Sequence, residues 1–222
     1  MIPTAHPRVK VCCIASVDEA WMAIRAGADA LGLVSAMPSG PGVIDEAAIR
    51  TIAAAIPPPI ATVLLTSLQE PAAIVAQQQR CGTNTIQLCD HVAPAGHAAL
   101  RAALPGVRLL QVIHVSGPDA IEQAQVAAPH VDALLLDSGN QNLPVKELGG
   151  TGRTHDWALS QQIRASVSVP VFLAGGLRAH NVQAAIEAVQ PFGLDLCTGV
   201  RTDGRLDVEK LQAFFAQVRP GA

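Results

Sequence analysis

Residues 170–200 read PVFLAGGLRAHNVQAAIEAVQPFGLDLCTGV, and they contain the pattern from which the fold class is predicted. It contains a short apolar run, a glycine-rich turn, an alanine-rich segment of helical period, and a second apolar run that ends in another glycine turn. Continuous apolar runs are typical of strands buried on both faces, and a helix between two of them is the crossover of a parallel pair. The stretch therefore predicts a strand–helix–strand unit of a parallel sheet.

The same alternation runs through the whole chain of 222 residues, in eight units of similar length. The predicted strands are Arg8–Ile14, Asp29–Ser35, Ile60–Thr66, Thr85–Cys89, Arg108–His114, Ala133–Asp137, Pro170–Ala174 and Leu194–Thr198. The predicted helices are Val17–Ala26, Glu46–Ala55, Glu70–Arg80, Pro94–Ala103, Asp119–Ala128, Asp156–Ala165, Asn181–Val189 and Val208–Val218. A doubly wound open sheet has the same alternation, but eight near-equal units favour closure. We therefore predict an α/β protein with a single domain over residues 1–222, a (β/α)₈ TIM barrel.

The composition argues against a membrane protein, a secreted protein and a nucleic-acid-binding protein. Half of the residues are hydrophobic, yet Gly, Pro or charged residues break the longest apolar runs before the ~18 to 20 residues that span a bilayer. Residues 1–10 contain no apolar signal segment, so we expect a cytoplasmic protein. The net charge is −3, there is no basic run, and the aromatic residues are four Phe and two Trp, so nucleic acid is not an expected partner.

The five cysteines are an odd number in a chain with the pattern of an intracellular enzyme, so we expect free thiols rather than disulfides. There is no CxxC motif and no His/Cys metal spacing, and we expect no metal site. Cys12 and Cys13 fall at the end of the first predicted strand, where adjacent side chains point to opposite faces. The two thiols are therefore not expected to bind one ion together.

Reactive side chains of such a barrel project from the carboxyl ends of the strands, and Cys12 is the first candidate there. A thiolate is a competent base toward a carbon acid when a nearby cation lowers its pKa, and Lys10 lies two residues back on the same face. Free cysteines are also common as small core residues. Cys12 is therefore either a general base or part of the packed interior.

Asp137 closes the apolar run ALLLD at the end of the sixth predicted strand. A carboxylate there either faces solvent at the barrel mouth or is paired. This place suits a general acid or base, and the alternative is a cap or a hydrogen bond that closes the following loop. That loop, Ser138–His155, is rich in Gly, Asn and Gln, and a connection of this length is usually a lid or a binding loop.

Three glycine-rich turns, Gly149–Gly152, Ala174–Gly176 and Cys197–Gly199, follow the last three predicted strands. Glycine lets backbone N–H groups converge on an anion, and the loops after the seventh and eighth strands commonly hold phosphate in these barrels. Each turn alone is also compatible with an ordinary loop. Their occurrence at the ends of consecutive strands favours a phosphate site.

Together these segments resemble the phosphoribosylanthranilate isomerase family over nearly the whole chain. VKVCC at residues 9–13 is similar to the family's VKICG, and QLCD at residues 87–90 is similar to its QLHG. Further matches are LLLD at 134–137, GGTGRTHDW at 149–157, LAGGL at 173–177 and NV at 181–182. LDLCTGV at 194–200 is similar to the family's VD.SSGVE, in which serines stand at the positions of Cys197 and Thr198. The order and spacing of these motifs make the resemblance specific.

The resemblance implies a cofactor-independent aldose-ketose isomerase, an intramolecular oxidoreductase of tryptophan biosynthesis. Such an enzyme converts N-(5'-phosphoribosyl)anthranilate to the aminoketose by an Amadori rearrangement. By motif, Asp137 is the general acid that assists ring opening, and Cys12 is the general base that removes the C2 proton. The residues implied to bind phosphate or other parts of a small phosphorylated substrate are Gln87, Gly150, Gly152, Gly175, Gly176, Thr198, Gly199 and Arg201. Members of the family are monomers or homodimers.

The chain departs from the family pattern at four places. Cys13 replaces a glycine, Cys89 replaces the histidine of QLHG, and Arg201 replaces a glutamate. The second loop reads SGPG at residues 39–42 and lacks the arginine that grips the anthranilate carboxylate. A bidentate clamp of this kind is among the stronger polar interactions. Arg201, or Arg153 from another loop, is a candidate replacement.

These departures leave two alternatives to the implied activity. One is a barrel isomerase that acts on a different phosphorylated sugar or amine, with a changed second loop. The other is a non-catalytic barrel that serves as a binding partner. The presence of both Cys12 and Asp137 argues against the second alternative.

Overall fold

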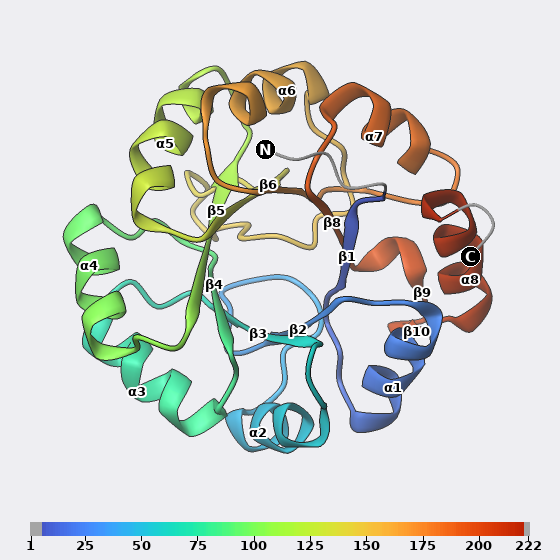
Figure 1. Cartoon of the computed structure of the whole chain (residues 1–222), viewed down its shortest axis with the longest axis horizontal. Coiled ribbons are helices and arrows are strands. Elements are labelled where there is room, and N and C mark those ends of the chain that lie inside the picture. Colours follow the sequence, from blue (N-terminus) through green and yellow to red (C-terminus); the bar gives the residue numbers. More distant parts are fainter. Residues whose placement is uncertain (1–5, 220–222) are drawn as a thin grey trace.

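Eight parallel strands close into a barrel in the order β1 to β8, surrounded by eight helices, in the computed structural model, which describes residues 6–219 (Figure 1). The strands are β1 (Arg8–Val11), β2 (Ala30–Val34), β3 (Ala61–Thr66), β4 (Thr85–Leu88), β5 (Arg108–His114), β6 (Ala133–Asp137), β7 (Val171–Leu173) and β8 (Gly193–Leu196). The helices are α1 (Val17–Ala26), α2 (Glu46–Ala55), α3 (Pro71–Cys81), α4 (Pro94–Ala103), α5 (Asp119–Ala127), α6 (Trp157–Ser166), α7 (Val182–Val189) and α8 (Val208–Val218). The predicted TIM barrel is confirmed.

Smaller elements and the chain ends complete this description. A short antiparallel pair, β9 (Arg201–Thr202) and β10 (Arg205–Leu206), lies between β8 and α8, and single 3-10 turns occur at Ala128–His130 and Thr198–Val200. Residues 1–5 and 220–222 lie outside the described part. The predictions of one domain over residues 1–222 and of no signal segment in residues 1–10 fall partly on them and stay predictions.

The barrel closes where the first strand pairs with the last. Lys10 of β1 lies beside Asp195 of β8 on one side and beside Ala30 of β2 on the other. Because all eight strands are parallel, their carboxyl ends meet at one rim, and the loops after the strands gather there.

Helix boundaries follow the sequence closely, because local signals define them: side-chain caps at several helices and a proline in the first turn of α4. Helices α1, α2, α4 and α8 begin and end at the predicted residues. Ser16 caps α1 by accepting a hydrogen bond from the Glu19 N–H at 3.1 Å. Asp207 caps α8 in the same way, by accepting from the N–H groups of the first turn.

The largest difference from the predicted strands is at β1, which ends at Val11 and not at Ile14. Cys13 has φ 63°, in the left-handed region that L residues rarely adopt, and this conformation cannot continue a strand. The prediction that Cys12 and Cys13 end the first strand is therefore wrong, because both residues lie in the turn after it.

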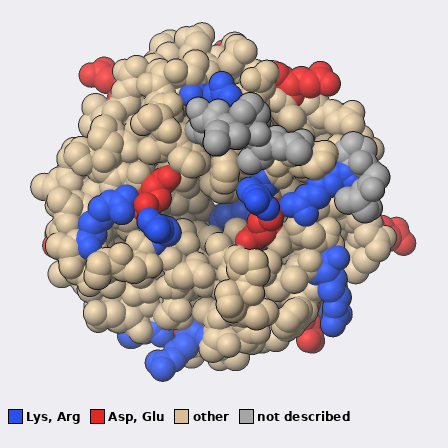
Figure 2. Space-filling view, in the orientation of Figure 1, with Lys and Arg blue, Asp and Glu red and all other residues tan. Residues whose placement is uncertain are grey.

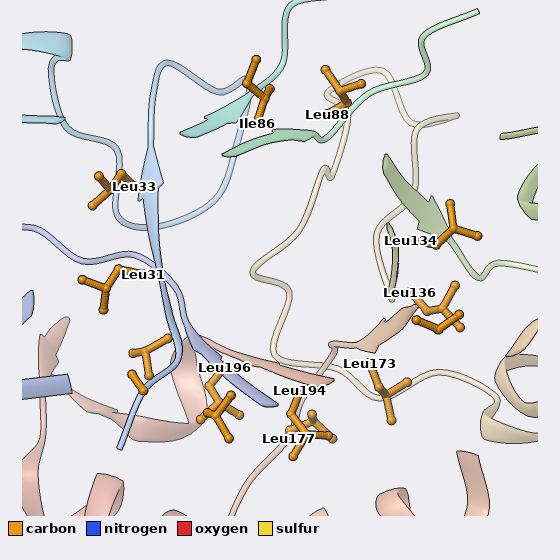
Figure 3. Close-up of a cluster of buried hydrophobic side chains, with 14 of the residues drawn as sticks. Leu31, Leu33, Ile86, Leu88, Leu134, Leu136, Leu173, Leu177, Leu194 and Leu196 are labelled. Atoms are coloured by element: carbon orange, nitrogen blue, oxygen red, sulfur yellow. The ribbon is translucent and has the colours of Figure 1, made fainter. Parts of the chain in front are cut away.

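Apolar side chains form two shells, one outside and one inside the ring of strands. Figure 3 shows leucines and one isoleucine of several strands pointing away from the barrel axis. These side chains belong to a large cluster that includes residues of the surrounding helices. A smaller interior cluster contains Val34, Val63, Leu65, Val112 and Leu135, together with Cys12, Cys13 and Cys89. The alternation along each strand thus sends every second side chain into the barrel, where the site lies.

Charged side chains of opposite sign lie side by side near the centre of the face in Figure 2. At the amino ends of the strands, Asp29 pairs with Arg8 and Arg219, and Asp132 pairs with Arg101 and Arg108. Such partly exposed pairs contribute little stability each.

None of the helices within residues 6–219 has the length and apolar character needed to cross a bilayer.

Candidate active site

A cavity opens at the rim where the carboxyl ends of the strands meet. The empty space between its walls, including the open mouth, is about 690 Å³. Its walls come from the segments that follow β1, β2, β4, β6, β7 and β8. The residues named from the sequence that line it are Cys12, Gln87, Asp137, Gly150, Gly152, Gly175, Gly176, Thr198 and Gly199. The fold thus brings together candidates from several loops.

Cys12 lies at the floor of this cavity and is 6% exposed. Its backbone N–H donates to the Leu196 carbonyl at 2.7 Å, which fixes it against β8. Gly32 of β2 makes room for the thiol, since a Cβ there would lie 2.9 Å from Cys12 Sγ. A hydrogen bond from the Cys13 thiol and the charge of Lys10 lower the pKa of Cys12, against the effect of burial. The expected influence of Lys10 on this thiol is therefore present.

Lys10 itself is paired with a residue that the sequence did not single out. Its ammonium donates to Asp195 Oδ1 at 2.8 Å inside the barrel. Burial opposes the charge of Lys10, but the Asp195 carboxylate outweighs it and raises the pKa of Lys10. Burial also raises the pKa of Asp195, and the ammonium opposes that shift. Asp195 and Cys197 lie two residues apart in LDLC, so the alternation of a strand places their side chains on the same face. This spacing is the signal in the sequence that would have identified Asp195.

Cys13 lines the same cavity as Cys12, so the prediction that the two side chains face opposite ways is wrong. The left-handed backbone at Cys13 is the physical reason, because the alternation of a strand does not apply there. Its sulfur lies 2.7 Å from the sulfur of Cys197, which follows β8. Hydrogen bonding to Cys12 and Cys197, together with burial, raises the pKa of Cys13, so this residue is the proton donor of the group.

Asp137 lies at the end of β6 and is 7% exposed. The N–H of Ser138 donates to its Oδ1 at 2.7 Å. This is the hydrogen bond to the following loop that the sequence offered as the alternative role of Asp137. The second oxygen, Oδ2, lies against Gly149, where a Cβ would come within 2.9 Å of it. Glycine at position 149 therefore leaves Oδ2 accessible on the cavity side.

The glycine turns of the long loop and of β7 pack directly on each other. Gly152 and Gly176 have φ 68° and 59°, and a Cβ on Gly176 would lie 2.9 Å from the Gly152 carbonyl oxygen and from the Thr154 nitrogen. Thr198 completes this corner, since its Oγ1 lies 3.3 Å from a Cβ built on Gly152. Backbone and small polar groups thus line one end of the cavity, an arrangement suited to an anion.

Gln87 and Cys89 lie side by side in the cavity wall at the end of β4. The Gln87 amide donates to Cys89 Sγ at 3.6 Å, and its Oε1 is buried without a partner among the described residues. Burial raises the pKa of Cys89 well above its ordinary value. Burial thus favours the neutral form of Cys89, whereas the surroundings of Cys12 shift its pKa in the opposite direction.

Arg201 does not face the cavity, which differs from its predicted role toward the substrate. Its guanidinium donates to the carbonyls of Cys12 at 3.2 Å and Cys13 at 2.5 Å, and pairs with Glu19 at 3.2 Å. These contacts satisfy the carbonyl groups of the turn after β1. They also pair the charge of Arg201 with Glu19 outside the cavity. We therefore correct the expectation: Arg201 holds the backbone that carries the two thiols.

The cavity has no cationic side chain in its lining, among residues 6–219. Ser39, Gly40 and Pro41 of the second loop contribute to the wall, and the Ser39 hydroxyl donates to the Lys146 carbonyl at 2.7 Å. Arg153, the other proposed replacement for the missing arginine, pairs with Glu147 instead. Within the described residues, no group of three or more His, Cys, Asp and Glu has the geometry to hold a metal ion.

Comparisons with known sequences converge on one family. The family model for N-(5'phosphoribosyl)anthranilate (PRA) isomerase matches residues 9–217. The N-(5'-phosphoribosyl)anthranilate isomerase of Methanocella arvoryzae is 35% identical over 213 residues, which are 96% of this chain and 98% of that protein. The N-(5'-phosphoribosyl)anthranilate isomerase 2 of Methanosarcina mazei is 36% identical over 214 residues, 96% and 94% of the two chains.

Solved structures give the same result. Phosphoribosyl anthranilate isomerase of Thermus thermophilus superposes with a TM-score of 0.79 and 29% identity, over 95% of this chain and 97% of the other. The enzyme of Thermococcus kodakaraensis gives 0.80 and 26%, over 97% and 100%. A phosphoribosyl anthranilate isomerase in complex with reduced 1-(o-carboxyphenylamino)-1-deoxyribulose 5-phosphate gives 0.77 and 25%, over 96% and 98%.

Proposed function

The chain belongs to the N-(5'-phosphoribosyl)anthranilate isomerase family, and from this membership we propose that Cys12 and Asp137 catalyse the Amadori rearrangement of N-(5'-phosphoribosyl)anthranilate. The observation that carries the proposal is that both side chains line one cavity with the three glycine turns. The reaction is an aldose-ketose isomerisation in tryptophan biosynthesis. Its steps are proton transfers, so a side chain that gives a proton and one that takes a proton are sufficient for it.

The phosphate of the substrate binds at the glycine-lined end of the cavity. Gly152, Gly175, Gly176 and Gly199 let the backbone come close to an anion there, and Thr198 adds a hydroxyl group. Fixing the phosphate places the ribose between β1 and β6. The binding energy of this remote group thereby orients the carbon atoms that react.

Asp137 acts first, as the general acid. Its Oδ1 is held by the Ser138 N–H, and its Oδ2 faces the cavity beside Gly149. A proton passes from Asp137 to the ring oxygen while the bond from that oxygen to C1 breaks. The electron pair on the substrate nitrogen forms a double bond to C1, and the open-chain product is a protonated Schiff base.

Cys12 acts second, as the general base. The positive nitrogen acidifies the proton on C2, and the Cys12 thiolate removes it to give an enolamine. The hydrogen bond from Cys13 and the charge of Lys10 lower the pKa of Cys12, which favours the thiolate that this step needs. Cys12 then returns its proton to C1, and Asp137 takes a proton from the 2-hydroxyl group. The aminoketose is formed, and both side chains end in their starting protonation states.

The carboxylate of the anthranilate ring lacks a cationic partner in the lining that residues 6–219 provide. Backbone N–H groups of the second loop, Ser39–Gly42, bind it instead, because the Ser39 hydroxyl already donates to the Lys146 carbonyl. A neutral donor contributes less than a bidentate arginine, so we expect a higher KM than a member with the arginine would have.

We further propose that a small phosphorylated molecule is the partner of this chain, and that the protein is a cytoplasmic monomer or homodimer. The family match supports the first statement, as does a related isomerase whose structure holds a phosphorylated ligand. The oligomeric state is measured directly by light scattering of the purified protein.

The proposed activity is tested with freshly generated N-(5'-phosphoribosyl)anthranilate, whose fluorescence is lost on conversion. We expect loss faster than spontaneous hydrolysis, and growth of a tryptophan auxotroph that lacks the isomerase. Cys12→Ala and Asp137→Asn each lower kcat by about 10²- to 10⁴-fold, the usual contribution of a general acid or base. Cys81→Ala is the matched control, because Cys81 is a buried thiol of α3 outside the cavity. Wild-type turnover no greater than that of the Cys12→Ala/Asp137→Asn double variant contradicts the proposal.

A further inference from the structure

Four of the five cysteines gather in the lining of the active-site cavity. Two of them, Cys13 and Cys197, are in direct contact, with their sulfur atoms 2.7 Å apart. Cys13 occupies the position of a glycine in the family motif, and Cys197 stands in LDLCTGV where the family has a serine. The isomerase chemistry described above uses Cys12 and needs neither a thiol at position 197 nor a contact between positions 13 and 197.

We propose that Cys13 and Cys197 are a modification site, which a hydroperoxide oxidises to a disulfide that reversibly inactivates the isomerase. Formation of the disulfide does not depend on which reaction the protein catalyses, whereas the inactivation rests on the proposed function.

The backbone holds the two thiols in place. Cys13 and Cys197 follow β1 and β8, which pair along their whole length and are fixed further by the hydrogen bond from the Cys12 N–H to Leu196. The left-handed conformation of Cys13 turns its thiol into the cavity. On its other side, a Cβ on Gly42 would lie 2.9 Å from Cys13 Sγ, and Pro41 O lies 3.6 Å from it. The Cys13 thiol is therefore confined beside Cys197, and the ~2.05 Å of a disulfide bond requires only a small approach.

The cavity mouth gives the oxidant access to one thiol before the other. Cys197 is partly exposed, whereas Cys13 is 4% exposed. The Cys197 sulfur attacks one oxygen of hydrogen peroxide, the O–O bond breaks, and a sulfenic acid and one water form. Cys13 sulfur then attacks the Cys197 sulfur and displaces hydroxide, which takes a proton from solvent as a second water. In sum, the Cys13 and Cys197 thiols, the Cys12 thiolate, one peroxide and one proton from solvent give one disulfide, a neutral Cys12 thiol and two waters.

Oxidation also removes a proton donor from the general base. In the reduced protein the Cys13 thiol donates a hydrogen bond to Cys12 and lowers the pKa of Cys12. When Cys13 attacks Cys197, its proton passes to the neighbouring Cys12 thiolate. The product is a neutral Cys12 next to a disulfide that donates no hydrogen bond, so the base is lost although its own sulfur is unchanged. A thiol reductant restores both thiols and the donor.

Two other pairings are less favourable in this geometry. A bond between the adjacent residues Cys12 and Cys13 closes a small ring that distorts the backbone far from disulfide geometry. Cys89 is 1% exposed and is held between the amide and the carbonyl of Gln87. Both pairings are distinguishable by experiment, because each leaves a different cysteine free.

The test treats the full-length protein with one to a few equivalents of hydrogen peroxide, blocks free thiols with an alkylating reagent, and digests with trypsin. We expect one new species by mass spectrometry that joins residues 11–25 to residues 179–201 and disappears on reduction. The Cys12→Ala variant still forms this species, and the Cys13→Ala variant does not. Absence of the linkage in the wild type, or its persistence in Cys13→Ala, overturns the proposal.

Activity provides the second readout, with each variant compared with its own untreated rate. The wild type and Cys81→Ala lose at least tenfold in turnover and recover it with a thiol reductant. Cys197→Ser, which carries the serine of the family motif, keeps most of its own rate after the same treatment. An equal loss of turnover in Cys197→Ser and in the wild type overturns the proposed inactivation by the disulfide. A wild type that forms the linkage on treatment, but has no isomerase activity before treatment, leaves the modification site standing and refutes the proposed function alone.

Discussion

Lys10 and Asp195 form an ion pair in the barrel interior, with Nζ 2.8 Å from Oδ1 and side chains 1% and 9% exposed. A Cβ on Gly32 would lie 3.1 Å from Lys10 Nζ and 2.9 Å from Cys12 Sγ, so the ammonium and the thiol face the same small space in the wall. The pair therefore places a positive charge next to the proposed base, while Asp195 balances that charge inside the protein.

Lys10→Met is expected to destabilise the fold. It leaves Asp195 buried without its partner, and breaking a buried pair on one side typically lowers the free energy of unfolding by about 3 to 5 kcal/mol. The double variant Lys10→Met/Asp195→Leu removes both charges and recovers most of that loss. Urea unfolding followed by circular dichroism measures both. Equal stability of the single and double variants means that the pair is not ionic.

The pH dependence of kcat/KM reports the hydrogen bond from Cys13 to Cys12. The thiolate is the active form, so activity falls as the pH drops through the pKa of Cys12, which this hydrogen bond and Lys10 lower. Cys13→Ala removes the donor, so the pKa of Cys12 rises and the acidic limb of the profile moves to higher pH. Cys13→Ser keeps a donor and is the matched control, with a smaller movement. An unmoved limb in Cys13→Ala shows that the donor does not act on the base.

Pro41→Arg tests the missing carboxylate clamp. Pro41 lies in the cavity wall within the second loop, where no lining residue is cationic among residues 6–219. A charge-assisted hydrogen bond is worth about 1.5 to 3 kcal/mol, so KM for N-(5'-phosphoribosyl)anthranilate falls roughly tenfold or more while kcat changes little. Pro41→Gln is the neutral control. If KM is unchanged in Pro41→Arg, the anthranilate carboxylate does not bind at this loop.

Gly176→Ala probes the phosphate end of the cavity. The added Cβ would lie 2.9 Å from the Gly152 carbonyl oxygen and the Thr154 nitrogen, and the residue has φ 59°. Alanine there forces the two glycine turns apart, so we expect KM to rise by roughly tenfold or more and inhibition by inorganic phosphate to weaken in parallel. Gly106→Ala is the control, because a Cβ at Gly106 meets nothing within 4 Å. Unaltered phosphate inhibition in Gly176→Ala places the phosphate elsewhere.

Much of the fold was predictable because its signals are local. The apolar runs mark the strands, and side chains such as Ser16 and Asp207 mark helix starts within one turn of the chain. The order of motifs also identified Cys12 and Asp137, because residues at the carboxyl ends of parallel strands must meet at one rim. Gly152 and Gly176 follow from the same reasoning, as glycine turns at consecutive strand ends.

The order of amino acids is enough to define the eight strand–helix units, the rim that carries the candidate site, and the lack of an arginine in the second loop. The contacts between side chains depend instead on how the chain folds. Closure of β1 against β8 brings Lys10 to Asp195 and Cys13 to Cys197, residues that are separated by almost the whole chain. The resemblance to the family implies that Arg201 binds substrate, whereas its guanidinium turns back to the carbonyls after β1. Such pairings depend on closure of the barrel and on the left-handed backbone of Cys13. Neither can be recognised from the periodicity of apolar residues in the sequence.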